Sequence, residues 1–324
     1  MKKILLSLVL ACFTIGNVWS QDEEHIVYDL YLFNYYLMNP AVAGAERCGH
    51  FMLTDRHQWI GMEGPNTQTF SYRGRPWENI GVGGYIFRDQ NGNHNYLGGQ
   101  LSVAYHIPMS PSNRYHIATE LDRQLSFGVS VKFANTSFDF SKITNPDDPA
   151  LQSDTGFYPN ANAGVYYTSY GFFTGLSVTN LIPNNLDMFG KGEPTMPLTG
   201  MFFIGNGFKL GSTTTIEPSI MVRASEPYGG IGDFNLKFAQ TLSDDFSYYV
   251  SASYRGWLNI GSTKDLTVPT YQSLHIKPMV GFRYGNWNLA CGWGIDLNKL
   301  AQSNYGSPEI MLGYTLCIPA QFCR

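Results

Sequence analysis

Charged side chains are scarce in this sequence. Asp, Glu, Lys and Arg make up 14% of its 324 residues, whereas a soluble globular domain carries about 25%. Beyond the first 20 residues, no stretch approaches the ~20 continuous apolar residues that a membrane-spanning helix needs. The composition therefore argues against an ordinary soluble domain, and the lack of a second long apolar run argues against a helical membrane protein.

Metal-binding and catalytic patterns are also missing. None of the five cysteines has C-x-x-C spacing and the seven histidines are scattered, so we expect no metal site and no cofactor. No Ser-His-Asp set stands out, and Gly81-Val82-Gly83-Gly84 lacks the lysine and following helix of a phosphate loop. We therefore do not expect an enzyme, and we interpret these glycines as allowing a bend or close packing. Cys317 and Cys323 are near enough in sequence to form a disulfide; the alternative is that the cysteines are small hydrophobes on strand faces.

The first 20 residues have the features of an export signal. Lys2 and Lys3 precede an apolar run over residues 4–15, and small residues at the −3 and −1 positions place cleavage after Ser20. The alternative is a lipoprotein modified at Cys12, which the continuation of the apolar run past Cys12 disfavours. Cleavage removes two lysines and no acid, which takes the net charge from −4 to −6. An acidic exported chain argues against nucleic acid as a partner.

What the sequence does contain favours a transmembrane β-barrel. Hydrophobic residues reach 44%, yet the mean hydropathy is −0.16 because they are interleaved with polar residues. Aromatic residues reach 15%, with 21 Tyr and 21 Phe. A barrel needs an apolar lipid face that alternates with a polar lumen face, and aromatic girdles at both interfaces.

The mature chain divides into an N-terminal segment, residues 21–49, and a barrel, residues 50–324. Apolar residues between 28 and 44 have helical spacing, and Asn39-Pro40 would stop a helix. We therefore predict a short helix that plugs or lines the barrel mouth; the alternative is a surface helix outside the barrel. The alternative of a surface helix accounts less well for the corner formed by Asn39, Pro40, Ala41 and Gly44.

From residue 50 the pattern becomes that of an all-β, antiparallel barrel. Runs of β-prone residues alternate with turn signals such as Asn91-Gly92, Gly211-Ser212 and Gly285-Asn286. Counting these runs predicts about fourteen strands, an even number suited to a barrel. With both termini periplasmic, the polar loop over residues 139–157 would be external.

The C-terminal stretch predicts the strand that closes the barrel. After the turn signal at Gly306 comes a run of β-prone residues. Within it, Gly313, Leu316 and Ile318 have the glycine-x-x-apolar-x-apolar spacing of the last strand of an outer-membrane barrel. We expect this strand to pair with the first one, over residues 51–56, because a sheet with open edges is unsuited to lipid. The residues that we assign to this closing role are Glu309, Gly313, Tyr314, Leu316 and Ile318.

A second candidate motif follows the first strand at Gln58, Trp59, Ile60 and Gly61. Trp59 has the position of an interfacial girdle residue; the alternative is a corner in which Trp59 and Gln58 pack on Asn39-Pro40-Ala41. Charged residues facing the lumen need partners. The candidates for such pairs are Arg73, Arg88, Arg223, Arg255 and Arg283 with Asp55, Asp89, Glu217, Asp233 or Asp296.

Several short motifs in a fixed order carry a family resemblance that spans nearly the whole mature chain. They are Tyr31-Leu32-Phe33-Asn34, Asn39-Pro40-Ala41-Val42-Ala43-Gly44, Arg56-His57-Gln58-Trp59-Ile60-Gly61, Gly64-Pro65-Asn66-Thr67, Leu125-Ser126-Phe127-Gly128, Glu217-Pro218-Ser219, Asp233-Phe234-Asn235-Leu236, Ser253-Tyr254-Arg255 and Gly306-Ser307-Pro308-Glu309. In these the chain resembles the PorP/SprF family, outer-membrane proteins of the type IX secretion and gliding machinery of Bacteroidetes. It departs from the pattern at Pro308 and in extra length over residues 114–122.

The resemblance implies a non-enzymatic outer-membrane component. Its implied partners are the periplasmic ring and peptidoglycan-linked subunits of the secretion apparatus, exported adhesin-type cargo, and outer-membrane lipid. Two other classes stay open at this point. One is a channel for small or hydrophobic solutes, because an N-terminal plug with Asn-Pro-Ala also occurs in fatty-acid transporters. The other is a lipid-modifying enzyme of the outer membrane.

Overall fold

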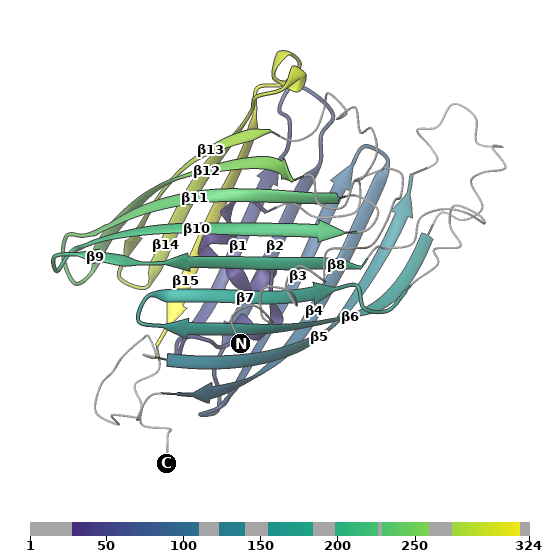
Figure 1. Cartoon of the computed structure of the whole chain (residues 1–324). Coiled ribbons are helices and arrows are strands. Elements are labelled where there is room, and N and C mark those ends of the chain that lie inside the picture. Colours follow the sequence, from purple (N-terminus) through teal and green to yellow (C-terminus); the bar gives the residue numbers. More distant parts are fainter. Residues whose placement is uncertain are drawn as a thin grey trace, which may run out of the picture.

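The fold is a closed barrel of antiparallel strands around a segment from the N-terminal part of the chain (Figure 1). This computed structural model describes residues 28–109, 123–139, 155–183, 198–225, 229–258 and 274–317. The strands are β1 (Gly49–His57), β2 (Asn66–Gly74), β3 (Ile80–Asn91), β4 (His94–Pro108), β5 (Arg123–Phe138), β6 (Thr155–Ser169), β7 (Phe172–Thr179), β8 (Thr199–Asn206), β9 (Phe208–Leu210), β10 (Thr214–Ser225), β11 (Gly229–Thr241), β12 (Phe246–Leu258), β13 (His275–Tyr284), β14 (Trp287–Asp296) and β15 (Ser307–Leu316).

The wall has the fourteen strands that the sequence predicts. Strands β8 and β9 both pair with β10 and are one strand interrupted at Gly207. The fifteen labelled elements therefore form a wall of fourteen strands. The barrel closes where β1 pairs with β15, from Gly49 opposite Leu316 to Arg56 opposite Glu309. The predicted pairing of the first and last strands is thus observed, and the described sheet is closed without a free edge between them.

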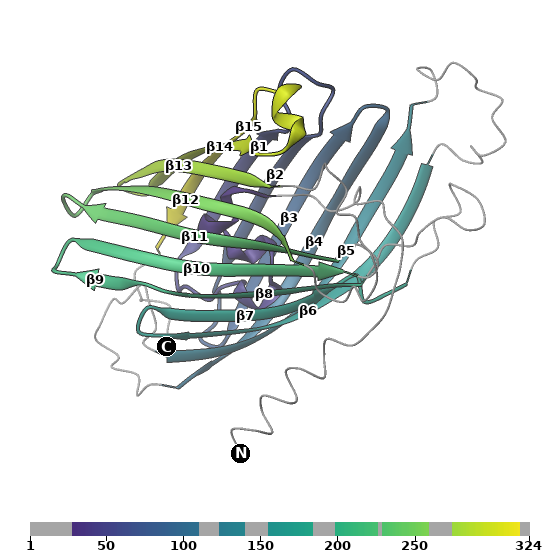
Figure 2. The same cartoon turned by 45° about the horizontal axis from the view of Figure 1, so that its top comes forward.

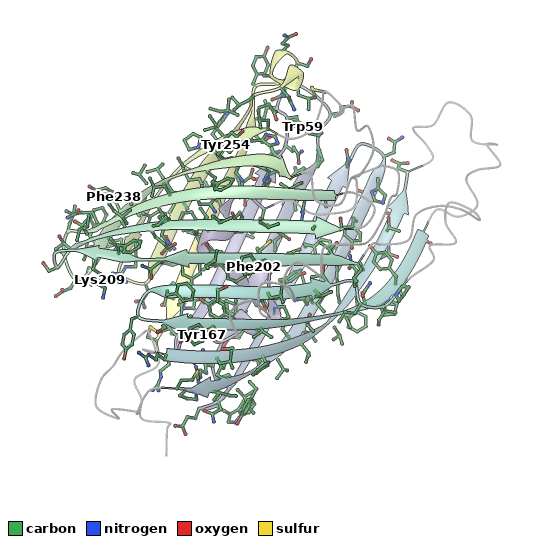
Figure 3. All side chains as sticks on the ribbon, in the orientation of Figure 1. Trp59, Tyr167, Phe202, Lys209, Phe238 and Tyr254 are labelled. Atoms are coloured by element: carbon green, nitrogen blue, oxygen red, sulfur yellow. A yellow bond between two sulfur atoms is a disulfide. The ribbon has the colours of Figure 1, made fainter. Side chains whose placement is uncertain are left out.

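Side chains alternate between the two faces of the wall, as a strand requires. On β5, Val129 and Val131 are exposed on the outer face while Ser126 and Ser130 are buried in the lumen. On β15, Ile310 is exposed and Glu309 is buried. Figure 3 shows side chains such as Phe202 and Tyr254 on the outside of the ribbon. An apolar outer face over a polar inner one is the pattern of a wall that faces lipid.

The two ends of the barrel differ in their connections. At what we call the turn end, at the left of Figure 1, the turns 170–171, 211–213, 242–245 and 285–286 are short, and the connection 109–122 is longer. At the opposite end, the loop end, the segments 139–154, 180–198 and 259–274 are long, and the connections 92–93 and 226–228 are short. Exposed aromatic residues mark both ends: Tyr284 and Trp287 at the turn end, and Trp293 and Tyr305 at the loop end. This arrangement agrees with the two predicted girdles.

The N-terminal segment corrects one prediction. In place of one helix over residues 28–44, it forms three short 3-10 turns, η1 (Leu30–Phe33), η2 (Tyr35–Leu37) and η3 (Pro40–Val42). Asn34 separates the first two in a non-helical conformation, with φ −148° and ψ 67°. A helix this short gains little from its own hydrogen bonds, and the polar walls of the lumen compete for its backbone and side chains. No helix in the described ranges has the length and apolarity needed to cross a membrane.

A disulfide joins the ends of β1 and β15 at the seam of the barrel, where these two strands pair. Cys48 precedes β1 and Cys317 follows β15, and their sulfurs are bonded across 269 residues of sequence. The suggested Cys317–Cys323 pair is therefore wrong, because Cys317 is already bonded to Cys48. The pairing follows from the register, which places Gly49 opposite Leu316 at the turn end. Cys291 is a free, exposed cysteine.

Candidate functional site

Residues 28–45, which we call the luminal segment, lie inside the barrel. They are drawn in purple between the front and rear strands, and Figures 1 and 2 agree on this placement. The segment begins near the loop end, where Asp29 meets Arg56 at the end of β1. It reaches the turn end at Gly44, which packs against Gly74 at the end of β2. The segment therefore runs along the lumen instead of lying across one mouth.

Hydrogen bonds tie the luminal segment to strands all around the wall. The Tyr28 hydroxyl bonds Thr69 on β2 at 3.0 Å, and the Tyr36 hydroxyl bonds Ser102 on β4 at 2.9 Å. On the other side of the lumen, Asn235 on β11 donates to the Tyr31 hydroxyl at 2.8 Å. Apolar contacts accompany these bonds: the buried rings of Tyr31 and Tyr36 belong to one hydrophobic cluster with wall side chains. These contacts fix both the position and the rotation of the segment.

A cluster of buried charges holds the first residues of the luminal segment. We call it the Asp29 cluster, and its members are Asp29, Arg56, Asp233, Arg255, Lys277 and Glu309. Only Asp29 comes from the luminal segment; the other five come from β1, β11, β12, β13 and β15. All six side chains are buried. One luminal residue is thus bound by strands from both sides of the barrel seam.

Arg255 and Lys277 bridge the two aspartates of the cluster. Arg255 makes a two-pronged contact with Asp233, with both nitrogen–oxygen distances 2.7 Å, and its Nη1 lies 3.1 Å from Asp29. Lys277 Nζ lies 3.1 Å from Asp29 and 3.2 Å from Asp233. Asp233 and Arg255 are directly opposite each other on neighbouring strands. A planar guanidinium bound by both prongs has little freedom to turn, so the pair is a fixed platform for Asp29.

Arg56 and Glu309 complete the cluster on the other side. Arg56 donates to the Asp29 carboxylate at 3.2 Å and to Gln58 at 2.5 Å. Glu309 accepts hydrogen bonds from the backbone nitrogens of Asp29 and Leu30, at 2.7 and 3.3 Å. Arg56 and Glu309 are partners in the β1–β15 register. The same cross-strand pair that closes the barrel therefore also grips the luminal segment.

The charges in the cluster balance. Three carboxylates face three cations. Arg56, Arg255 and Lys277 each place a nitrogen within 3.2 Å of the Asp29 carboxylate. Buried charges are costly unless they are paired and hydrogen-bonded, and removing one partner exposes that cost. Loss of any one of these six side chains should therefore leave an uncompensated buried charge and destabilise the cluster.

Asn39 anchors the other half of the luminal segment. Its side-chain oxygen accepts a hydrogen bond from the backbone nitrogen of Ala41 at 2.9 Å, as a helix N-cap does. Its amide nitrogen donates to the carbonyls of Val165 on β6, at 2.9 Å, and Leu176 on β7, at 3.2 Å. One fully buried side chain therefore joins η3 to two neighbouring strands.

Glycines in the wall make room for this half of the segment. A Cβ on Gly128 would lie 2.3 Å from the backbone nitrogen of Ala41, and one on Gly81 would lie 2.0 Å from the carbonyl oxygen of Ala43. A Cβ on Gly164 would lie 2.1 Å from the side-chain oxygen of Asn39. The interpretation of the 81–84 glycines as residues for close packing is consistent with the contact at Gly81.

The Gln58–Gly61 motif lies at the loop end and contacts the segment before β15. The Trp59 backbone nitrogen bonds the Ser307 hydroxyl at 3.1 Å, and the Ile60 and Tyr305 backbones are hydrogen-bonded together. Gly61 has φ 96°, and a Cβ there would lie 2.8 Å from the Tyr305 ring. Figure 3 places Trp59 at this end. The structure thus places this motif against β15 and Asn39-Pro40-Ala41 against β5, β6 and β7.

The residues assigned to the closing strand divide between the two faces of the wall. Glu309 points into the lumen, and Leu316 is exposed next to the disulfide. Gly313 pairs with Met52 on β1 and with Asn288 on β14. The Tyr314 ring packs on Trp287, with ring centroids 4.9 Å apart. Ile318 lies outside the described residues.

Of the suggested luminal ion pairs, the structure contains Arg255–Asp233. Other candidate acids have different partners: Glu217 pairs with Lys237 at 2.7 Å, and Asp296 with His275 at 2.6 Å. Sequence reasoning missed Asp29, Arg56 and Lys277 as members of the site. For Arg56 and Lys277 the available signal is that charged residues are rare inside these strands; Asp29 lies outside the strands and has no such signal. Within the described residues, no group of three or more His, Cys, Asp or Glu side chains could hold a metal ion.

Comparisons with known proteins identify the family and the fold. The model of the family described as "Type IX secretion system membrane protein PorP/SprF" matches residues 20–314. No curated protein matches the chain. Among solved structures, the CymD monoaromatic hydrocarbon channel has a TM-score of 0.52 at 9% identity, covering 87% of this chain and 92% of its own. The toluene transporter TbuX of Ralstonia pickettii has a TM-score of 0.51 at 11% identity, covering 95% and 99%. At this identity the likeness concerns the fold alone.

Proposed function

The chain belongs to the PorP/SprF family of type IX secretion system membrane proteins, and from that premise we propose that it is a non-enzymatic anchor in the outer membrane. In this role it holds periplasmic subunits of the secretion apparatus, the ring and its peptidoglycan-linked parts, at the membrane. It also supports export or surface attachment of particular adhesin-type cargo. The closed barrel, its apolar outer face and its aromatic ends support residence in the outer membrane.

The observation that carries this proposal is the occupied lumen. The luminal segment is hydrogen-bonded to both sides of the wall and is fixed at one end by the Asp29 cluster. Releasing it would break a balanced set of buried charges, which is costly. A barrel whose interior holds a fixed segment is poorly suited to pass folded cargo. Its ends and its outer wall remain available to partners, which suits an anchor.

We assign different partners to the two ends of the barrel. Outer-membrane barrels have short turns on the periplasmic side and longer loops outside. The turn end would therefore contact the periplasmic subunits, and the loop end, including the 139–154 connection, would face cargo. The predicted external position of the 139–157 loop is in keeping with this orientation, because β5 ends and β6 begins at the loop end.

Site-specific cross-linking tests the orientation and the partners together. A photo-cross-linker placed at Ser212 or Asp244, in two turns of the turn end, should capture periplasmic secretion subunits in intact cells. The matched control carries the cross-linker at Glu63, exposed at the loop end, and should not capture them. Capture from Glu63 alone would reverse the orientation, and capture from neither end would contradict the anchor role.

Deletion of the gene tests the role in cargo. We expect an intact outer membrane from which particular proteins are lost at the cell surface. If deletion abolished uptake of a small nutrient and left the surface proteins unchanged, a role as a solute channel would replace the anchor proposal.

A channel for small or hydrophobic solutes is the second candidate. The observation that favours it is a hollow of about 60 Å³ beside the luminal segment. Liposome swelling separates the two functions. The anchor proposal expects no solute-dependent swelling with the parent protein, whereas a channel would admit solutes below a size limit.

A further inference from the structure

Strand β9 extends past its neighbour β7 at the turn end. The strand formed by β8 and β9 continues to Leu210, whereas β7 begins at Phe172, opposite Asn206. The last backbone hydrogen bond on this side joins the Gly207 nitrogen to the Gly171 carbonyl at 3.0 Å. Beyond that bond, β9 is paired with β10 alone among the described strands. Figures 1 and 2 show β9 at the left tip of the wall.

The backbone of β9 has hydrogen-bonding groups on the side away from β10. In an antiparallel pair, hydrogen-bonded and non-hydrogen-bonded residues alternate, so every second residue of a strand turns its N–H and C=O toward the same neighbour. Since Gly207 turns its N–H toward β7, Lys209 turns its N–H and C=O to the same side, where β7 has already ended. Within the described ranges, residues 208–210 make no backbone hydrogen bond on that side. An open edge of this kind can accept another strand.

At other hairpins of the turn end, the pairing instead continues up to the turns. The Gly285 nitrogen bonds the Asp245 carbonyl at 2.7 Å, and the Thr315 nitrogen bonds the Asn286 carbonyl at 2.8 Å. These bonds join neighbouring hairpins where their strands end. The step between β7 and β9 is therefore a local feature of the wall and not a general fraying of this end.

The side chains of β9 give the open edge two different faces. Phe208, Lys209 and Leu210 are all exposed, and Figure 3 places Lys209 at the turn end. Successive side chains of a strand point to opposite faces, so Phe208 and Leu210 share one face and Lys209 lies on the other. The adjoining residues 167–173 and 211–215 include no Asp or Glu. A strand added here would meet a lysine on one face and two apolar side chains on the other.

We propose that β9 is a docking edge for an extended segment of a periplasmic secretion subunit, which adds to the wall as a further strand. It takes the place that a longer β7 would occupy. An extended backbone can satisfy the N–H and the C=O of Lys209 together. Cross-strand pairing favours an acidic residue opposite Lys209 and apolar residues beside Phe208 and Leu210, so the segment has apolar, acidic and apolar residues in turn. This contact rests on the proposed anchor role, which places periplasmic subunits at the turn end.

Recovery of the secretion ring with the tagged full-length protein tests the proposal. Membranes from cells that contain the secretion apparatus are solubilised in mild detergent, and the ring subunits that accompany the protein are quantified by mass spectrometry. Lys209→Pro removes the N–H on the open side and leaves the pairing of Phe208 and Leu210 with β10 in place. We expect it to lower the recovery of ring subunits about tenfold. Lys209→Ala, the matched control, keeps the N–H and should retain most of the recovery.

Hydrogen–deuterium exchange distinguishes an added strand from a contact between side chains. In the isolated complex, the Lys209 amide should exchange about tenfold more slowly than in the protein alone, because it gains a hydrogen bond. The amides of Phe208 and Leu210 face β10 in both states and should change little.

The outcomes separate the docking edge from the anchor role. Equal recovery of the ring with the parent and with folded Lys209→Pro, or unchanged exchange at Lys209, overturns the docking edge and leaves the anchor role standing. If the parent recovers no ring and the cross-linkers at Ser212 and Asp244 capture none, both are overturned. Disulfide-linked dimers of Lys209→Cys in a Cys291→Ser background would place a second copy at the edge, which also overturns the proposal. If Lys209→Pro does not fold, as judged by the gel mobility of unheated samples, the exchange at Lys209 decides alone.

Discussion

The ammonium of Lys277 lies 3.1 Å from the carboxylate of Asp29, although 248 residues separate them in the chain. Asp29 belongs to the luminal segment and Lys277 to β13, so the contact holds the inside of the barrel to its wall. Arg56 and Arg255 approach the same carboxylate from β1 and β12. The luminal segment is therefore held by charge where its described part begins, and not by apolar packing alone.

The first prediction follows from this contact. Asp29→Asn keeps the shape of the side chain but leaves three buried cations facing two carboxylates. We expect it to lower the free energy of unfolding by about 3–5 kcal/mol, the usual effect of breaking a buried ion pair from one side. Urea unfolding, followed by the change in gel mobility of unheated samples, measures the loss. Asp244→Asn, in an exposed turn, is the control, and an equal effect of the two substitutions would contradict the anchoring role of Asp29.

The second prediction concerns the covalent seam. Replacing Cys48 and Cys317 together by serine removes the bond between the ends of β1 and β15. We expect stability to fall by about 2–4 kcal/mol, because the disulfide restricts the unfolded chain over a long loop. The heated parent should also migrate faster without reductant than with it, and the double variant should lose this difference. Cys291→Ser, at an exposed free cysteine, should change neither property.

Much of the wall could be predicted because its signals are local. Alternation of apolar and polar residues marks each strand, and turns such as Gly285-Asn286 mark each hairpin. Gly285 has φ 54°, a conformation in which glycine is favoured. Since these signals span a few residues, they remain readable without knowledge of the fold. The pairing of first and last strands followed from the need to close the sheet.

The interior could not be predicted in the same way, because its contacts are distant in sequence. The luminal segment has helical spacing, but Asn34 bonds Ser71 and Asn39 bonds two strands, so the wall decides its conformation. The cysteine pair depends on register: Cys48 and Cys317 meet only because β1 and β15 do. Asp29 has no sequence neighbour that marks it as a site residue. Its role appears only when five strands are brought around it.

The third prediction compares two positions on the closing strand. Leu312 is exposed near the middle of β15, and Leu316 is exposed at its last residue. Leu312→Arg should cost about 2–4 kcal/mol if the middle of the strand lies at the membrane midplane, whereas Leu316→Arg near the interface should cost about 0–1 kcal/mol. The folded fraction recovered in outer membranes measures both. Equal and full assembly of the two variants would mean that this face of β15 does not contact lipid.

The last prediction tests whether the close approach of wall and luminal segment keeps the lumen shut. Gly128 on β5 lies against η3, and a Cβ there would meet the Ala41 backbone nitrogen at 2.3 Å. Backbone cannot move aside as a flexible side chain can, so Gly128→Ala should cost about 1–3 kcal/mol by overpacking and should push η3 away from the wall. Gly200 on β8 is the matched control, because the nearest atom to a Cβ there is 3.8 Å away. In planar bilayers the parent and Gly200→Ala should conduct little, and Gly128→Ala should conduct more. If Gly128→Ala kept both the stability and the low conductance of the parent, the packing of η3 against β5 would not be what closes the lumen. If the parent itself conducted freely, the occupied lumen would no longer support an anchor over a channel.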